Sequence, residues 1–359
     1  MYFKFCTFQV KAASCIVSFI GFNRQCSAFL DRYHWNQYRL LIVLAVLPCI
    51  FAWKQVSSLP NGLLYLASWL LVANLGLTIG YHRYYAHKQF LASNFFKIIL
   101  AFAASMSWQG SLNSWALQHR IHHSLSDQQG DPHSPRDFSN SQKPVSFKSF
   151  YHAHYGWMSH VGQQIRAGEK GMISSGRNLA YVNRLSKILG NNNRYLDFDG
   201  QYKYAHPYIL DLVQNPLERC MSDFYALFSL LSVILVVGVS IFVAFIQSGS
   251  FDDQLILANV ISAIYWGVIV RSVLTQEMSN ITNSLGHAFG YRNFETKDCS
   301  KNNILIGLLT LGEGFQNNHH YNSMSINFSR RWYEIDLASY FLKILFLTPL
   351  AKPIQKQSY

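Results

Sequence analysis

Eight histidines of this chain fall into short groups with spacings close to a helix turn. Side chains at positions i, i+3 and i+4 share one face of a helix, so such a group aims several rings at one point. Neutral imidazole is the commonest protein ligand for iron, zinc and copper. The sequence therefore predicts a metal site formed by His82 and His87, by His119, His122 and His123, by His287, and by His319 and His320.

The number of rings indicates two metal ions. A tetrahedral zinc takes four ligands, so eight imidazoles exceed the need of one ion. Two amides join the predicted site: Asn283 lies four residues before His287, and Gln316 lies three residues before His319, where a third ring would complete a triplet. Because an amide oxygen binds iron less well than imidazole, Gln316 is predicted to bind weakly, to hold a water or to position a ligand.

The other histidines lack such grouping. Isolated histidines are usually core or surface residues, and this interpretation applies to His34, His152, His154, His160 and His206. We interpret the tripeptide Asp131-Pro132-His133 as a structured turn and leave its histidine off the ligand set. The six cysteines are scattered without a Cys-x-x-Cys pair, which excludes a zinc ribbon, an iron–sulfur site and a disulfide framework.

The composition predicts that membrane helices position these groups. Half of the residues are apolar, 15% are aromatic and only 13% are charged, which is unusual for a soluble enzyme. We expect spans at about residues 40–53, 62–80, 224–246 and 255–273. Buried core helices of a soluble protein are the alternative, but the run 224–246 contains no charge. The predicted fold is all-α and integral to the membrane, with four transmembrane helices under a cytosolic helical cap.

The charge distribution predicts the orientation. The formal net charge is +12, but the basic residues form no single stripe, so we expect no nucleic-acid partner. The short connector between the first two spans contains one basic residue, Lys54. The short connector between the last two spans contains no basic residue, and it contains Asp252 and Asp253. Basic residues flank the opposite ends instead: Arg32, Arg39, Arg83, Lys88, Arg219, Arg271 and Lys297. The positive-inside rule then places both termini and every histidine group in the cytoplasm.

This topology predicts three regions. Residues 1–39 form a cytoplasmic or interfacial segment, which we prefer to a signal peptide because the apolar stretch 12–22 is short. Residues 40–321 contain the spans, the polar cap at about 127–204 and all predicted ligands. Residues 322–359 form a cytoplasmic C-terminal segment.

The histidine groups, taken with their neighbours, resemble the integral-membrane fatty acyl desaturases of the stearoyl-CoA Δ9 type. The resemblance covers most of residues 40–321. It is carried by Gly80–His87, Trp115 with His119–His123, Asp131–His133 followed by Gly156 and Trp157, Asn283–His287, and Gly312–Phe315 before Gln316–His320. It implies four transmembrane helices, two irons held by about nine histidines, an asparagine-held water and a buried, kinked acyl tunnel.

The chain departs from that family in two ways. The third histidine box of the family begins with His, where Gln316 stands here; front-end desaturases also carry Gln, but usually with a fused haem domain and its His-Pro-Gly-Gly motif, which this chain lacks. The acid and base that CoA-using members place before the second box are replaced by Leu117 and Gln118, and the basic pair after Gly-Trp is missing near 160–162. The acyl carrier, CoA or a lipid, stays open.

The resemblance predicts an O2-dependent fatty acyl desaturase with two irons that introduces a double bond at Δ9. It implies an external electron donor, either a ferredoxin, a flavodoxin or a cytochrome b-type protein, and a basic cytosolic face would attract such acidic carriers. Two alternatives stay open: a membrane di-iron hydroxylase of a lipid or alkane, and a metal-poor lipid-binding relative without activity, which Gln316 motivates.

Overall fold

The computed structural model describes residues 18–51, 59–128, 131–136, 145–159 and 207–354. Most of this part is helical, as predicted, and two short strands form a single small sheet within it. Residues 18–32 are helical. The next elements are α2 (His34–Phe51), α4 (Leu59–Leu71), the π-helix η1 (Val72–Ala86), β1 (Phe90–Ala92), α5 (Asn94–Met106), α6 (Leu112–Leu125), α7 (Phe147–Tyr151) and the π-helix η2 (His152–Gly156). The C-terminal half contains the 3-10 helix η3 (Pro207–Ile209), α10 (Leu210–Gln214), α11 (Pro216–Asp223), α12 (Tyr225–Ser248), α13 (Asp253–Ile264), the π-helix η4 (Tyr265–Val270), α14 (Arg271–Ala288), α15 (Ile304–Leu309), α16 (Gln316–Tyr321), α17 (Leu337–Leu345) and β2 (Ala351–Pro353).

Two helical runs are long and apolar enough to cross a bilayer. α12 has 24 residues, and the run from α13 through η4 to α14 has 36, against the roughly 20 that a bilayer requires. Gly249 ends α12 with a φ of 69°, a left-handed conformation that glycine adopts without strain. These runs overlap the predicted spans 224–246 and 255–273. Residues 40–51 of the predicted span 40–53 lie in α2, and 62–80 lies in α4 and η1, while residues 52 and 53 lie outside the described residues.

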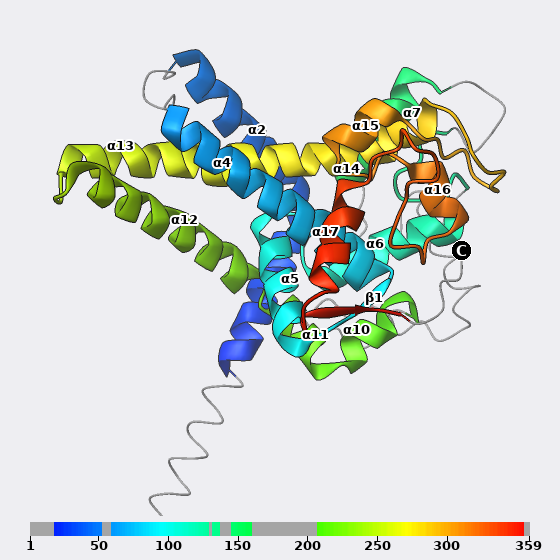
Figure 1. Ribbon diagram of the computed structural model, residues 1–359, viewed down its shortest axis with the longest axis horizontal. Coiled ribbons are helices and arrows are strands. Elements are labelled where there is room, and N and C mark those ends of the chain that lie inside the picture. Colours follow the sequence, from blue (N-terminus) through cyan, green and yellow to red (C-terminus); the bar gives the residue numbers. More distant parts are fainter. Residues whose placement is uncertain (1–17, 52–58, 129–130, 137–144, 160–206, 355–359) are drawn as a thin grey trace, which may run out of the picture.

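The long helices expose their apolar side chains. On α12, Leu230, Ile234, Phe242 and Ile246 are each 57–63% exposed. Continuous apolar surface of this kind is costly in water and fits a bilayer. Figure 1 shows α2, α4, α12 and α13 extending to one side of the molecule, away from α6, α7 and α16. The described part thus has a membrane-facing side and a compact end.

The first histidine group lies on a helix that continues past its predicted end. The sequence predicted a span over 62–80, but η1 runs to Ala86 and includes His82. This helix packs closely on α5: a Cβ at Gly76 would lie 2.3 Å from the carbonyl oxygen of Ala103, so a larger residue would separate the two helices. The close approach fixes the depth and direction of η1 beneath α6.

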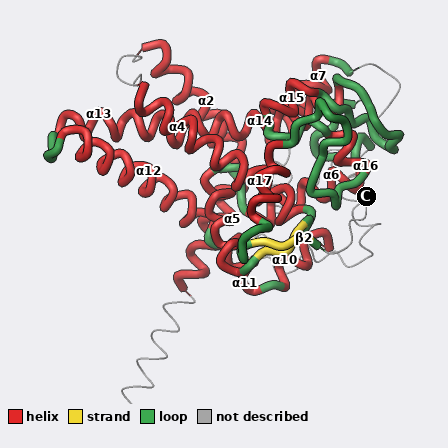
Figure 2. Tube along the Cα trace, in the orientation of Figure 1, coloured by secondary structure: helices red, strands yellow, loops and turns green. Residues whose placement is uncertain are grey.

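The C-terminal residues fold back onto the same region. β2 pairs with β1 in antiparallel register, with Phe90 opposite Pro353 (Figure 2). α17 begins at Asp336, whose side chain accepts a hydrogen bond from the backbone N–H of Ser339 and caps the helix. α17 packs on η1. Residues 337–353 therefore brace the segment that carries the first histidine group.

Candidate metal centre

Five of the eight predicted rings form one group. It contains His82 and His87 from η1 and its C-terminal cap, His119 and His123 from α6, and His319 from α16, with one ring nitrogen from each within 4.8 Å of the others. Nε2 of His319 lies 2.9 Å from Nε2 of both His82 and His123. Nε2 of His87 lies 2.8 Å from Nε2 of His119. The five rings thus converge on one place, and the short contacts between them join Nε2 atoms.

The remaining three rings form a second, smaller group. His122 from α6, His287 from α14 and His320 from α16 place their ring nitrogens within 4.8 Å of one another. Their ring centroids are 4.9–5.1 Å apart. The two groups adjoin, because the rings of His123 and His320 stack with centroids 4.4 Å apart. The structure therefore brings together all eight histidines that the sequence singled out, in groups of five and three.

Four of the eight rings are held by carboxylates. The pairs, each through Nδ1, are His82 with Glu313 (2.5 Å), His122 with Asp131 (2.9 Å), His287 with Asp127 (3.0 Å) and His320 with Asp298 (2.7 Å). A carboxylate only accepts hydrogen bonds, so Nδ1 carries the proton and Nε2 keeps its lone pair. This arrangement is the one by which proteins fix the tautomer and raise the basicity of metal-ligating histidines. The sequence analysis missed these carboxylates.

Burial keeps four rings of the larger group neutral. Burial lowers the pKa of His87, His119, His123 and His319 well below the usual value, and the neighbouring imidazoles lower it further. Burial raises the pKa of Asp298, but the hydrogen bond and charge of His320, together with hydrogen bonds from Ser300 and Thr296, lower it below its usual value. Burial raises the pKa of Asp131 to about 6. The centre therefore has neutral nitrogen donors, and negatively charged carboxylates are hydrogen-bonded to some of the rings behind them. This arrangement suits a cation.

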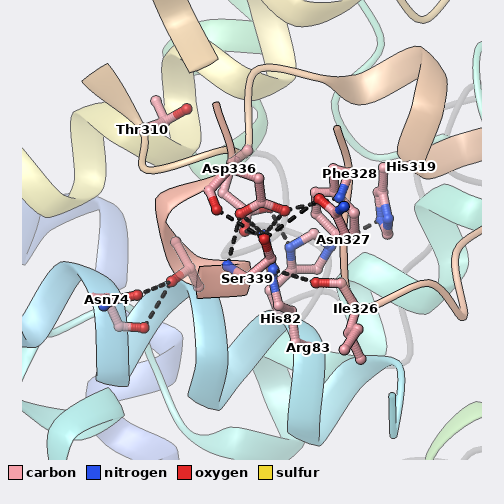
Figure 3. A network of polar contacts seen from close by, with 12 residues as sticks. Asn74, His82, Arg83, Thr310, His319, Ile326, Asn327, Phe328, Asp336 and Ser339 are labelled. Atoms are coloured by element: carbon pink, nitrogen blue, oxygen red, sulfur yellow. Dashed lines mark hydrogen bonds and ion pairs between the residues drawn. The ribbon is translucent and has the colours of Figure 1, made fainter. Parts of the chain in front are cut away.

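A buried ionic network joins the C-terminal segment to His82 (Figure 3). The guanidinium of Arg83 is fully buried and donates to both oxygens of Asp336, at 2.8 and 3.0 Å. It also donates to the backbone oxygen of Ile326 at 2.7 Å and lies 3.4 Å from Glu313. Glu313 accepts the Nδ1 proton of His82. Because Arg83 contacts both Glu313 and Asp336, the orientation of the His82 ring depends on Asp336 as well as on Glu313.

The unsatisfied ring nitrogens fit metal ions. Nε2 of His320 and Nδ1 of His319 are buried without a hydrogen-bond partner in the described part of the chain. His82 keeps its proton on Nδ1, so the lone pair on its Nε2 needs a hydrogen-bond donor. Nε2 of His319 faces Nε2 of both His82 and His123. A single proton on His319 Nε2 cannot satisfy both of these acceptors. Unpaired buried nitrogens are costly. A cation bound among these lone pairs would remove that cost.

The two predicted amides face the same region. A cavity of about 60 Å³ lies against both histidine groups, and Asn283 and Gln316 line it together with His82, His119, His122 and Trp115. The Nε2 group of Gln316 donates to the backbone oxygen of Glu313 at 2.5 Å. Trp115 stacks on His119 with ring centroids 5.0 Å apart. The amides therefore border the centre, and their role as ligands stays a prediction.

Most of the histidines that were not predicted as ligands lie outside both groups. His154 contacts Ser284 Oγ at 2.8 Å and Glu277 at 3.1 Å, and His152 contacts the backbone oxygen of Pro132 at 3.2 Å. His34 lines the cavity but joins no group of potential ligands among the described residues. His160 and His206 lie outside the described residues.

His133 differs from that prediction. It is only 4% exposed, and its ring centroid lies 4.2 Å from that of His122. It forms a third group of potential ligands with His122 and Asp131. The turn at Asp131 exists as predicted, since the backbone N–H of His133 donates to Asp131 Oδ1 at 3.1 Å. The available signal was its position ten residues after His123, too far for helical spacing.

Known proteins share these features. A family model described as fatty acid desaturase matches residues 57–343. The chain is 28% identical over 313 residues to a hex-5-enoyl-[acyl-carrier protein] acetylenase of Moorena producens, covering 86% of this chain and 81% of that protein. It is 27% identical over 323 residues to an sn-1 stearoyl-lipid 9-desaturase of Synechocystis, covering 90% and 79%. It is also 27% identical to a chloroplastic palmitoyl-monogalactosyldiacylglycerol delta-7 desaturase of Arabidopsis thaliana, covering 89% and 66%.

Proposed function

The chain belongs to the fatty acid desaturase family, as its histidine groups predicted, and from that premise we propose that it introduces a Δ9 double bond into a saturated acyl chain with O2 and two irons. Its family consists of membrane-associated oxidoreductases that act on acyl-lipids or acyl-CoA. The observation that carries the proposal is the convergence of eight imidazoles in two adjoining groups.

Imidazole nitrogens suit iron, and each group offers several. We assign His82, His87, His119, His123 and His319 to one iron, and His122, His287 and His320 to the other. Asn283 and Gln316 border the second iron, where an amide would hold a water. When bound, the irons supply, with O2 and external electrons, an oxidant strong enough to remove hydrogen from an unactivated methylene.

The protein's own contribution is orientation and exclusion of water. Carboxylates fix the tautomers of four rings. Trp115 stacks on His119 and so holds that ring against the cavity. The cavity adjoins both histidine groups and is lined by buried residues such as His122 and Gln316, so the reacting methylene would lie beside the irons and away from bulk water.

Two residues and some of the relatives support an acyl-lipid as the substrate. We propose an acyl-lipid rather than acyl-CoA, because the residues that CoA-using members place before the second box are replaced by Leu117 and Gln118. The relatives also include stearoyl-lipid 9-desaturases from two organisms, at 27% and 24% identity. A membrane-embedded substrate is consistent with the apolar exterior of α12.

Electrons must come from outside the chain. We propose a four-span, multi-pass topology with both termini and the metal centre in the cytoplasm, because basic residues flank that end of the spans. A net charge of +12 favours an acidic electron carrier. A ferredoxin, a flavodoxin or a cytochrome b-type protein meets this requirement.

The test is lipid profiling of a desaturase-deficient host that expresses the chain. We expect a new monounsaturated acyl species whose double bond maps to Δ9 by mass spectrometry of its dimethyl disulfide adduct, and no product without oxygen. A hydroxylated chain would instead support the hydroxylase alternative. An unchanged lipid profile from a well-expressed, iron-loaded protein would contradict the proposal.

A further inference from the structure

The two histidine groups are unequal, although they border one cavity. The larger group has five imidazoles and the smaller has three. The position that would add a ring to the smaller group is Gln316, which begins α16 and packs against the helix of His287: a Cβ built on Gly286 would lie 3.0 Å from Gln316 Cγ. From α16 the smaller group therefore receives one imidazole, that of His320, and an amide stands at position 316.

The amide of Gln316 is poorly placed to replace that imidazole. Its Nε2 donates to the backbone oxygen of Glu313 at 2.5 Å, which ties the amide to the turn before α16. An amide oxygen is also a weaker donor to iron than an imidazole nitrogen. A better donor for the smaller group must come from another element.

His133 is such a donor. Its ring lines the cavity that Gln316 and Asn283 also line. One of its ring nitrogens lies within 4.8 Å of potential ligand atoms of His122 and Asp131. Nδ1 of His133 is buried and has no hydrogen-bond partner in the part of the chain that the structure describes. A buried, unpaired nitrogen is costly unless it binds something.

The surrounding residues hold this ring beside the smaller group. Asp131 accepts both the Nδ1 proton of His122 and the backbone N–H of His133, so one carboxylate fixes a ligand of the group and the turn that carries the extra ring. Trp157 packs edge-on against His133 with ring centroids 5.5 Å apart. The ring thus has a fixed neighbour on each side and a free nitrogen.

We propose that His133 is the fourth imidazole ligand of the smaller group and takes the place of the ring that Gln316 does not supply. The proposal rests on the proposed two-iron function. It predicts that the chain binds two irons because of His133, and that a histidine at position 316 makes His133 dispensable.

The experiment measures iron per chain by mass spectrometry in detergent-purified, iron-loaded protein. We expect two irons in the parent, about one in His133→Ala, and two again in the double variant His133→Ala with Gln316→His. His152→Ala is the matched control, because it removes a contact to the backbone oxygen of Pro132 in the same turn and leaves the His133 side chain in place, and it should keep two irons. Mössbauer spectra of the one-iron variant should keep the signal of the larger group.

Each other outcome overturns a defined claim. Two irons in His133→Ala would show that the ring is no ligand. One iron in both His133→Ala and the double variant would show that the substitution disturbs the turn and does not simply remove a ligand. Loss of both irons in His133→Ala would show that the substitution disturbs the fold. Fewer than two irons in the parent would contradict the two-iron function itself.

Discussion

Replacing Asp336 with asparagine tests the ionic network behind His82. The side chains of Arg83 and Asp336 are both 0% exposed and meet at 2.8 Å. Removing one partner of a buried pair costs about 3–5 kcal/mol, since the other charge stays buried. Glu313 lies 3.4 Å from Arg83 and compensates part of that charge, so we expect the lower end, about 3 kcal/mol. With an unfolding entropy of about 2.1 cal/mol/K per residue, 359 residues give about 1.3 °C per kcal/mol, so the Tm should fall by about 4 °C.

The assay is thermal unfolding in detergent, followed by fluorescence-detected gel filtration. Asp211→Asn is the matched control, because Asp211 pairs with Arg120 at 2.6 Å but its side chain is 42% exposed. Such a surface pair contributes under about 1 kcal/mol, so the control should lose no more than about 1 °C. Equal losses in the two variants would refute the reasoning that buried charge compensation stabilises this region.

Three further predictions concern the centre and the topology. His122→Ala and His319→Ala should each lower product by at least about 100-fold while the protein stays in the membrane; product at the level of the parent in either, measured by lipid profiling, would remove that ring from the centre. The pKa of Asp298 lies below its usual 3.8 in the folded protein, largely because of the contacts with His320. The charged carboxylate therefore contributes its full stabilisation above about pH 3.8, and this stabilisation is lost as the pH falls below that value. Asp298→Asn should thus lower the Tm of the metal-free protein at about pH 6, and the difference in Tm from the parent should shrink below about pH 4. A reporter fused after Tyr359 should read as cytoplasmic, and an external signal would contradict the four-span topology.

The convergence of the eight histidines was predictable because their spacing is local. His119, His122 and His123 share one helix, so helix geometry predicts that they lie near one another, although His122 joins the smaller group and the other two join the larger. Likewise the run 224–246 predicted α12 from its lack of charge. These features depend on neighbouring residues along the chain.

The division into five and three rings depends on tertiary packing. η1 continues through His82, which no composition signal marks, because the helix is sustained there by packing on α5. Glu313 and Asp298 reach their histidines from loops far along the sequence. The same is true of Asp336, which lies 253 residues from Arg83. Isolated acidic residues give no sign of such partners.

One measurement tests the central claim most directly: the Mössbauer spectrum of the purified parent protein loaded with 57Fe. Because the two histidine groups differ in number and in the carboxylates behind them, the account predicts two irons per chain with two distinct signals of equal area. A protein that holds less than one iron per chain, or one that gives a single mononuclear signal, would contradict it.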